Sequence, residues 1–367
     1  MSVATLVLRA PSANRVYAQA AGALARAEAH WVLGAHRGTP PQLTQRMIGG
    51  MPALEIPGAA DPATAHLLGT LSGAHGLFEI VEEDAAVPDR PLLRPLPTTA
   101  PLRHPSDLET ILKYPGKTNE QFTALLVNLG AALSAHRDRL AAGTLELLDP
   151  LCGRGTTLNR ALRLGLSPVG ADIDRKDVEA YRAFLTTWLR EHRYKHSVNS
   201  TALRVHGEQL GVRVDAELAE DKAAHRAGRT QQLRLLACDT TRLSKVLPSR
   251  SIDALVADLP YGVQHGARSR DAWQRSPLEV LRAAAPTWRS LLRDGAGLAL
   301  AYNRRTLEHA AATDALAAAD LRIISPDGAF RHRVDASIDR DVLLAIPTTH
   351  PQAEQLAALG ASAKETP

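Results

Sequence analysis

The residues best suited to chemistry in this chain lie where an apolar run ends, at Asp258-Leu259-Pro260-Tyr261. The run before them, residues 252–257, is typical of a buried strand, so an acid, a proline and an aromatic ring follow one another at its end. A carboxylate and a backbone carbonyl can accept the two hydrogens of an amino group, and an aromatic ring beside them can hold a planar molecule by stacking. A strand followed by an ordinary proline-containing turn gives the same residues, so a second motif must decide between the two interpretations.

The second motif covers residues 144–158, where a buried strand ending at Asp149 leads into a glycine loop and a helix start. Gly153 and Gly155 let the backbone approach a ligand closely. We expect Thr156 and Thr157 to cap the helix that follows. The exposed N–H groups at such a helix start can bind a carboxylate. The glycine spacing is shorter than that of the dinucleotide-binding G-x-G-x-x-G loop, so the motif predicts a different ligand.

Further acids follow the next two predicted strands. Asp172 lies about 20 residues beyond the glycine loop, where an acid binds ribose hydroxyls in nucleotide-binding α/β folds. Asp174, two residues later, is better suited to capping the helix that begins at Arg175. A third strand, residues 233–240, contains Cys238-Asp239 near its end. Strand-end acids on successive strands predict one shared site at the carboxyl edge of a parallel sheet.

These motifs resemble those of S-adenosylmethionine (SAM) enzymes that methylate exocyclic amino nitrogens. Asp258-Leu259-Pro260-Tyr261 is similar to the D-P-P-Y signature of that class, with Leu259 in place of the first proline. Residues 149–157 are similar to D-P-F-C-G-S-G-T-T, with Leu151 for Phe and Arg154 for Ser. Together with the tail at 330–337, the motifs and their order over residues 105–347 resemble the THUMP-type transfer-RNA guanosine N-methyltransferases.

The resemblance implies SAM as cofactor and assigns roles to residues. In that class an acid at the position of Asp239 receives the adenine amino group, and the segment before the first strand covers the methionine end. The cofactor-binding residues it implies are Asp149, Cys152, Gly153, Gly155, Thr156, Thr157, Asp172, Asp174, Cys238 and Asp239, with Lys117, Thr118 and Asn119 as further candidates. A helix over residues 119–136 capped by Thr118 or Asn119 explains that last segment equally well.

The catalytic residues it implies are Asp258, Leu259, Pro260 and Tyr261. Asp258 and the Leu259 carbonyl would each accept one amino hydrogen and so return the lone pair to nitrogen. The ring of Tyr261, rather than its hydroxyl, would stack on the base, which must be unpaired or flipped out. Arg268 and Arg270 in the following loop could contact phosphate.

The implied acceptor is a guanosine or adenosine in RNA, with transfer RNA favoured. Residues 1–100 do not read as a THUMP domain, which keeps two other interpretations open. One is an N-methyltransferase for a natural product, peptide or small metabolite. The other is a catalytically degenerate protein that binds nucleic acid, which the intact glycines and strand-end acids disfavour.

Composition sets limits on these interpretations. A net charge of +4 and a pI of about 9.2 permit an anionic partner. No charge-free apolar run of about 18 residues and no signal-peptide pattern occur in the sequence, so we expect a cytoplasmic enzyme that does not bind membranes. The 14 His form no metal-binding motif, and we expect no metal. Cys152 and Cys238 are best explained as small packing residues. The sequence leaves the oligomeric state undetermined.

The predicted organisation is a small α+β domain (1–100), a linker with a cofactor-covering helix (101–135), a methyltransferase domain (136–347) and a loose tail (348–367). The methyltransferase domain is expected to be a Rossmann-like, doubly wound α/β sheet of about seven strands, closed by an antiparallel pair at 321–325 and 339–346. The connection at 191–231 is unusually long. A solvated helical extension is slightly favoured there over a substrate-contacting insertion, with a hairpin near 205–220 as a further option.

Overall fold

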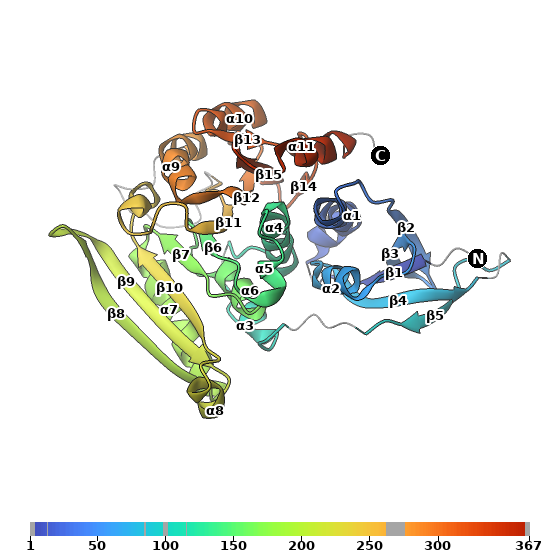
Figure 1. The fold of residues 1–367 in the computed structure, drawn as a ribbon, viewed down its shortest axis with the longest axis horizontal. Helices are drawn as coiled ribbons and strands as arrows, with labels where there is room; N and C mark the ends of the chain where they lie inside the picture. The colour runs from blue at the N-terminus through green and yellow to red at the C-terminus, as the bar shows by residue number, and fades with distance from the viewer. Residues whose placement is uncertain are drawn as a thin grey trace.

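The chain forms two sheets that lie side by side, with helices of each packed between them (Figure 1). A computed structural model describes residues 4–12, 14–83, 86–97, 102–114, 116–261 and 276–363. The first sheet is built from residues before position 96 and the second from residues after position 146. The predicted loop with Arg268 and Arg270 lies outside the described residues.

The N-terminal unit is an antiparallel five-stranded sheet in the order β2-β3-β1-β4-β5, with two helices. Its elements are β1 (Ala4–Arg9), α1 (Arg15–Arg37), β2 (Thr44–Ile48), β3 (Met51–Pro57), α2 (Pro62–Thr70), β4 (Ala74–Glu82) and β5 (Leu92–Pro95). Asn14 caps α1 by accepting from the backbone N–H groups of Val16 and Tyr17, and Gly38 ends the helix at φ +76°. The unit combines helices with a sheet, which is the α+β class that the sequence predicts for residues 1–100.

The second sheet has ten strands, and its central five are parallel in the order β10-β7-β6-β11-β12. These strands are β6 (Leu147–Asp149), β7 (Val169–Asp172), β10 (Gln231–Ala237), β11 (Ile252–Asp258) and β12 (Leu292–Asn303). The strand order reverses between β6 and β11, and such a reversal is where α/β sheets bind ligands. The fold is therefore the doubly wound, Rossmann-like α/β fold that the sequence predicts.

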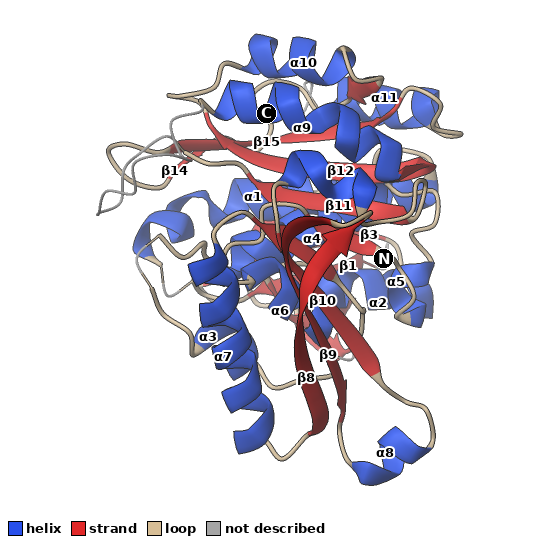
Figure 2. Cartoon of the chain, turned by 90° about the vertical axis from the view of Figure 1, so that its left-hand side faces the viewer, coloured by secondary structure: helices blue, strands red, loops and turns tan. Residues whose placement is uncertain are grey.

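Helices cover both faces of the parallel strands (Figure 2). One face carries α4 (Glu120–Leu133), α6 (Thr156–Arg163) and α7 (Arg175–Glu191); the other carries the 3-10 helix η1 (Thr240–Lys245), α9 (Pro277–Leu291) and α10 (His309–Ala317). Alternation along β11 explains the arrangement, because Ala254 and Val256 pack beneath α4 while Leu255 and Ala257 pack against the α9 side. Two short helices, α3 (Asp107–Thr110) and α5 (Arg139–Ala142), flank α4 in the chain.

Antiparallel strands extend both edges of the sheet. As predicted, β13 (Leu321–Ile323) and β15 (Asp339–Pro347) pair antiparallel, and the short β14 (His332–Arg333) also pairs with β15. At the other edge, β8 (Lys195–Val205) and β9 (Glu208–Ala219) form a long hairpin that precedes α8 (Lys222–Arg226).

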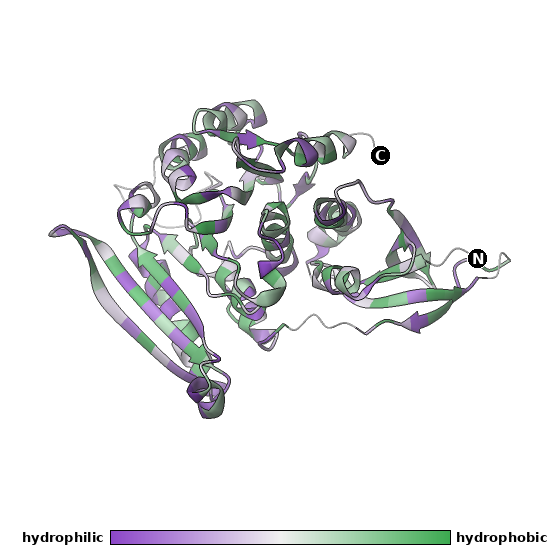
Figure 3. Ribbon diagram, in the orientation of Figure 1, coloured by the Kyte–Doolittle hydropathy of each residue, from purple (hydrophilic) through white to green (hydrophobic). Residues whose placement is uncertain are grey.

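The hairpin corrects the slightly favoured helical interpretation of residues 191–231. Its turn lies at His206 and Gly207, near the start of the segment 205–220 that was the further option. Hydrophobic and hydrophilic residues alternate along most of β9, and this period of two is typical of a strand rather than of a helix (Figure 3).

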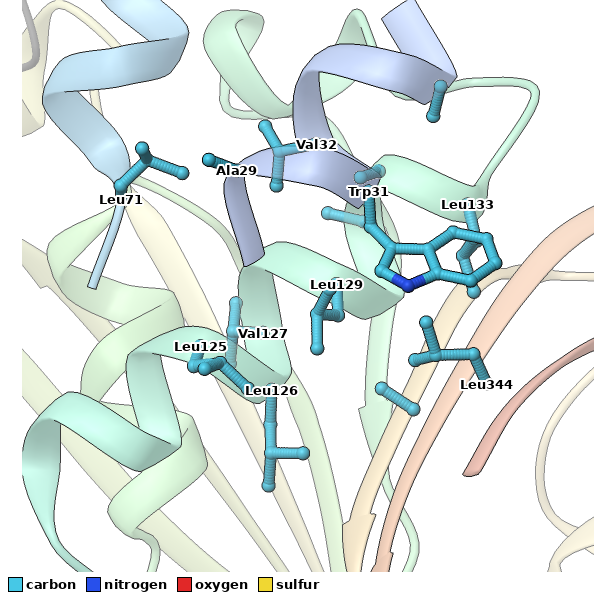
Figure 4. Close-up of a cluster of buried hydrophobic side chains, with 14 of the residues drawn as sticks. Ala29, Trp31, Val32, Leu71, Leu125, Leu126, Val127, Leu129, Leu133 and Leu344 are labelled. Atoms are coloured by element: carbon cyan, nitrogen blue, oxygen red, sulfur yellow. The ribbon is translucent and has the colours of Figure 1, made fainter. Parts of the chain in front are cut away.

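The two sheets are joined through a shared apolar core. Buried Ala29, Trp31 and Val32 of α1 lie against Leu125 and its neighbours on α4 (Figure 4). Twelve of the residues of α4 are buried, because the helix is covered by α1 on one side and by β11 and β12 on the other. A helix that is apolar on all sides requires such double coverage.

Residues 348–363, the described part of the predicted loose tail (348–367), are not loose. They contain α11 (Ala353–Ser362), whose Leu356 and Leu359 are buried in the shared core. Leu359 occupies the space that a side chain at Gly34 of α1 would need. The segment is rich in alanine and has few charges, so its sequence did not indicate a helix that packs on the core.

Glu28 is a fully buried acid in the interface between the two units. Its carboxyl group accepts from the backbone N–H and hydroxyl of Ser72 and, at 2.7 Å, from Nδ2 of Asn128 on α4. Burial raises the pKa of Glu28 above its ordinary value of 4.5, although these hydrogen bonds and the nearby Arg160 oppose the rise.

Replacing Glu28 should therefore change stability in a way that depends on pH. Glu28→Ala leaves the N–H and hydroxyl of Ser72 without their acceptor and leaves Asn128 Nδ2 with the Thr70 carbonyl alone, and each donor left unsatisfied costs about 1–3 kcal/mol. A carboxyl group with a raised folded-state pKa binds more protons when folded, so the free energy of unfolding of the wild type falls as pH rises above 4.5. Glutamine does not titrate, so Glu28→Gln lacks this loss of stability. The free energy of unfolding of Glu28→Gln relative to that of wild type should therefore rise with pH. Denaturant unfolding at several pH values measures both effects, and an unchanged stability of Glu28→Ala would contradict this role.

Candidate functional site

The predicted strand-end acids meet at the carboxyl edge of the parallel sheet. Asp149 ends β6, Asp172 ends β7, Asp239 follows β10 and Asp258 ends β11. The charges of Asp172 and Asp258 both act on Asp149, which lies between them in the strand order. The fold therefore places these acids at the point where the strand order reverses.

The glycine loop between β6 and α6 is shaped by positive φ angles. Gly153 has φ +47°, and a Cβ added there would meet no atom within 4 Å, so the backbone borders open space. Gly155 has φ +77° and is itself the N-cap of α6. A Cβ at Gly155 would collide with the Tyr181 ring at 2.6 Å, so this position requires glycine.

The predicted capping by Thr156 and Thr157 is wrong. Both residues lie inside the first turn of α6, and no side chain caps the N–H groups there. Thr156 Oγ1 is instead 3.0 Å from the hydroxyl of Tyr114, and the Thr157 side chain hydrogen-bonds to Asp149. The turn at Gly155 starts the helix one residue earlier than the threonines would need to act as caps.

Asp149 and Asp172 are buried carboxyl groups with few fixed donors. Asp149 accepts from the Leu151 N–H at 3.1 Å, and burial raises its pKa to about 7. Asp172 accepts from the N–H groups of Gly153 and Asp174, each at 2.8 Å, and burial raises its pKa to about 6. Both groups would gain from further donors or from a positive charge supplied by a ligand.

Asp174 caps α7, as its position in the sequence predicts, by accepting from the N–H of Lys176 at 2.8 Å. Ile173, between the two acids, is 42% exposed despite its apolar side chain. The motifs in the sequence did not single out Ile173. An exposed isoleucine beside Asp172 nevertheless offers an apolar surface that can contact a flat ring. Its signal in the sequence was an apolar residue between two acids at a strand end.

Cys152 and Cys238 are buried free thiols. Burial raises the pKa of both, that of Cys238 to about 11, so the less nucleophilic thiol form is favoured. Asp239 caps η1 through Oδ1, which accepts from the N–H and the hydroxyl of Thr241. These contacts give Asp239 a fixed orientation at the end of β10.

The segment before α4 reaches the same edge of the sheet. Asn119 caps α4 by accepting from the Phe122 N–H at 3.1 Å, so of the two predicted caps it is Asn119 that acts. Lys117 Nζ is bound to the Glu109 carbonyl and to Glu120. Thr118 donates its hydroxyl to Oδ2 of Asp258 at 2.7 Å, a contact 140 residues distant in sequence.

The Asp258 turn is held by groups from three elements. Oδ1 accepts from the hydroxyl of Tyr261, and Oδ2 accepts from Thr118 and lies 3.9 Å from Nη2 of Arg340 on β15. Leu259 is buried, and its N–H donates to the Ala301 carbonyl of β12 at 2.9 Å. The Tyr261 hydroxyl thus has a partner that the ring-only prediction did not include. Arg340 was missed because nothing near it in the sequence links it to Asp258.

A groove of about 490 Å³ lies next to these acids but does not contain them. It is lined by the first turn of α7, including Arg175 and Lys176, and by residues of β8, β9 and the end of β10. Its lining residues Arg175 and Ala237 lie close in the chain to Asp172 and Asp239, and no residue of the Asp258 turn lines it.

Among the described residues, no group of three or more His, Cys, Asp or Glu residues is arranged to hold a metal ion. No helix in the described ranges combines the length and apolar character that crossing a bilayer requires.

No family model and no curated protein matches the chain. Among solved structures it is similar to TrmN from Thermus thermophilus, with 14% identity over 94% of this chain and 99% of that chain and a TM-score of 0.35. It is also similar to a TehB-like SAM-dependent methyltransferase from Corynebacterium glutamicum ATCC 13032 Kitasato (11% identity, 57% and 84% covered, TM-score 0.34). A ribosomal protein L11 methylase from Lactobacillus delbrueckii subsp. bulgaricus gives 16% identity, 62% and 79% coverage and a TM-score of 0.34. Similarities with TM-scores this low do not establish the fold, which is assigned from the chain's own strand order.

Filling the space at Gly153 should abolish ligand binding at the glycine loop without unfolding the protein. Asparagine tolerates positive φ, so Gly153→Asn adds a side chain to the open space with little backbone strain. Gly207→Asn is the matched control, because Gly207 also has positive φ (+82°) and open space but lies at the hairpin turn. Calorimetric titration with SAM should show no binding for Gly153→Asn and wild-type binding for Gly207→Asn. Equal SAM affinity in both variants would exclude this loop as the binding site.

Proposed function

We propose that this protein is a SAM-dependent N-methyltransferase that acts on an exocyclic amino nitrogen, most favourably of a guanosine or adenosine in RNA. The observation that carries the proposal is the position of Asp258. This acid lies at the end of the strand next to Asp149, where the strand order reverses, with a hydroxyl donor on each carboxylate oxygen. The glycine loop that follows Asp149 borders open space.

The residues present fit SAM in charge and shape. The uncapped N–H groups at the start of α6 suit the methionine carboxylate, and buried Asp149 suits the methionine ammonium group. Asp172 suits the ribose hydroxyls, while Ile173 and Asp239 suit the ring and amino group of adenine. When bound, SAM supplies a methyl group on an excellent leaving group, so the protein's task is chiefly positioning.

The acceptor side of the site then depends on Asp258. An exocyclic amino group is a weak nucleophile because its lone pair is delocalised into the ring. Asp258 accepts one amino hydrogen and the Leu259 carbonyl accepts the other, which returns the lone pair to nitrogen. The hydroxyls of Thr118 and Tyr261 hold the carboxylate in orientation until the amino group arrives. Asp258 or water takes the proton that the nitrogen loses after transfer.

An RNA acceptor is supported by the charge of the chain and by the position of its N-terminal unit. The net charge is +4. Tyr17 of α1 contacts the ring of His332, which lies opposite Arg340 in the β14–β15 pair, so the N-terminal unit reaches the acceptor side. A second sheet beside the acceptor side provides surface that a small metabolite would not need.

Asp258→Ala should lose methyl transfer while retaining SAM binding. Removal of one charge-assisted hydrogen bond at a reacting centre typically costs on the order of 10²–10³ in rate. Asp314→Ala, which removes an exposed acid on α10, serves as the control and should behave as wild type. Turnover of labelled SAM and calorimetric SAM binding measure the two effects separately. Wild-type turnover by Asp258→Ala would rule out the amino-nitrogen mechanism.

The acceptor class can be tested with unfractionated transfer RNA against pooled small-molecule amines. If RNA is the acceptor, methyl transfer to transfer RNA should weaken as salt rises, since phosphate contacts release counterions. Tyr261→Ala should weaken RNA binding by about tenfold, because a stacked base is worth roughly 1–3 kcal/mol. Tyr261→Phe should retain the stacking and lose rate, because the hydroxyl that orients Asp258 is gone. Salt-independent transfer to small amines alone would move the acceptor to the metabolite class.

A further inference from the structure

Arg340 is a buried arginine without the close ion pair that such a residue normally has. Its exposed fraction is 5%. Nη2 is 3.9 Å from Asp258, beyond hydrogen-bond distance, and Nε has no hydrogen-bond partner among the described residues. Burying a guanidinium usually requires direct, often bidentate, bonds to a carboxylate. Arg340 is therefore not buried in order to form a close ion pair with Asp258.

Two aromatic rings hold the guanidinium instead. Its Cζ atom lies 4.5 Å from the centre of the Phe122 ring and 5.1 Å from the centre of the Tyr261 ring. Both distances are within the range of cation–π attraction. Arg340 therefore occupies one face of the Tyr261 ring, so a planar acceptor could stack only on the opposite face.

The Phe122 side of this arrangement is fixed from behind. The ring of His332 packs against Phe122 at 5.0 Å, and Tyr17 meets His332 edge-on at 6.0 Å. Burial lowers the pKa of His332 to about 4, so its ring is neutral near pH 7 and does not repel Arg340. Tyr17, His332, Phe122, Arg340 and Tyr261 thus form a continuous column that ends at the Asp258 turn.

The opposite end of β11 shows what a purely structural arginine does. Asp253, at the start of that strand, accepts from Arg293 at 2.6 Å and Arg139 at 3.2 Å, as well as from the Glu146 N–H at 3.1 Å. These bonds saturate the acid. Arg340 is close enough to act on Asp258 by its charge but leaves the carboxylate able to accept from a ligand.

We infer that Arg340 is the positioning residue of the acceptor side: it fixes the plane of the Tyr261 ring and, through it, the orientation of Asp258. This inference rests on the proposed function and adds to it the group that makes the stacking surface rigid. It also assigns the acceptor to the side of the Tyr261 ring opposite Arg340.

The first test reads the position of Tyr261 without any acceptor. The six tyrosines are replaced by 3-fluorotyrosine, and the Tyr261 signal is assigned in the fluorine NMR spectrum with Tyr261→Phe. In Arg340→Met the Tyr261 signal should shift and broaden while the Tyr302 signal, from buried Tyr302 of β12, stays in place. An unchanged Tyr261 signal in Arg340→Met would overturn the inference, whatever the acceptor proves to be.

The second test separates positioning from stability. Arg340→Met keeps an unbranched apolar side chain between the Phe122 and Tyr261 rings, and its melting temperature, measured alongside, reports any loss of stability. With transfer RNA and SAM, its KM for RNA should rise about tenfold, in line with the loss of a desolvated cation–π contact, and its affinity for SAM should be unchanged. Arg340→Lys keeps the charge without the planar face and should recover part of the loss. Arg322→Met removes an exposed arginine that pairs with Glu354 and should match wild type.

Failure of the proposed function and failure of the inference about Arg340 give different results. If wild-type protein neither binds SAM nor transfers methyl groups, the proposed function fails, and the fluorine signal still decides whether Arg340 holds Tyr261. If wild type is active and Arg340→Met keeps both its KM and its Tyr261 signal, the inference about Arg340 fails alone.

Discussion

The structure depends on the crowding of carboxylates at one edge of a parallel sheet. The reversal of strand order between β6 and β11 brings Asp149, Asp172 and Asp258 together, and the low polarity there raises the pKa of the first two. Such a cluster is unfavourable unless donors or positive charge compensate it. The compensation comes from backbone N–H groups of the glycine loop, from Thr118 and from Arg340. Each of these arrives from a different part of the chain.

The N-terminal unit packs against α4, the helix that also supports the surroundings of Asp258. Helix α4 carries Phe122, which faces Arg340, and Asn128, which binds Glu28 of α1. The same helix begins just after Thr118, the donor to Asp258. A shift of α1 would therefore act on α4 and, through its first turn, on Asp258. The interface is consequently part of the site's support as well as a join between two sheets.

The sequence predicted those parts of the site that are local. Gly153, Asp172 and Asp258 could be selected because each sits in a short motif at a strand end. The expected sheet of about seven strands has ten, because it also contains the hairpin β8–β9 and the short β14. Arg340 and the role of Thr118 could not be selected, because their partners lie 82 and 140 residues away and only the sheet order brings them together. The hairpin at β8–β9 and helix α11 were misjudged for a similar reason: the contacts that stabilise them, with β10 and with Gly34, are tertiary.

The two acids of β11 show how one strand serves stability and chemistry at opposite ends. Asp253 is fully buried and bonded to two arginines and a backbone N–H, so its hydrogen-bonding capacity is used within the protein. Asp258 is partly exposed and is held by two hydroxyls, neutral donors that an incoming amino group can displace at small cost. Arg340 supplies charge to Asp258 at 3.9 Å without taking up its lone pairs. A closer arginine would stabilise the carboxylate more strongly but would occupy its lone pairs. The longer separation therefore leaves Asp258 able to accept a hydrogen bond from a further donor.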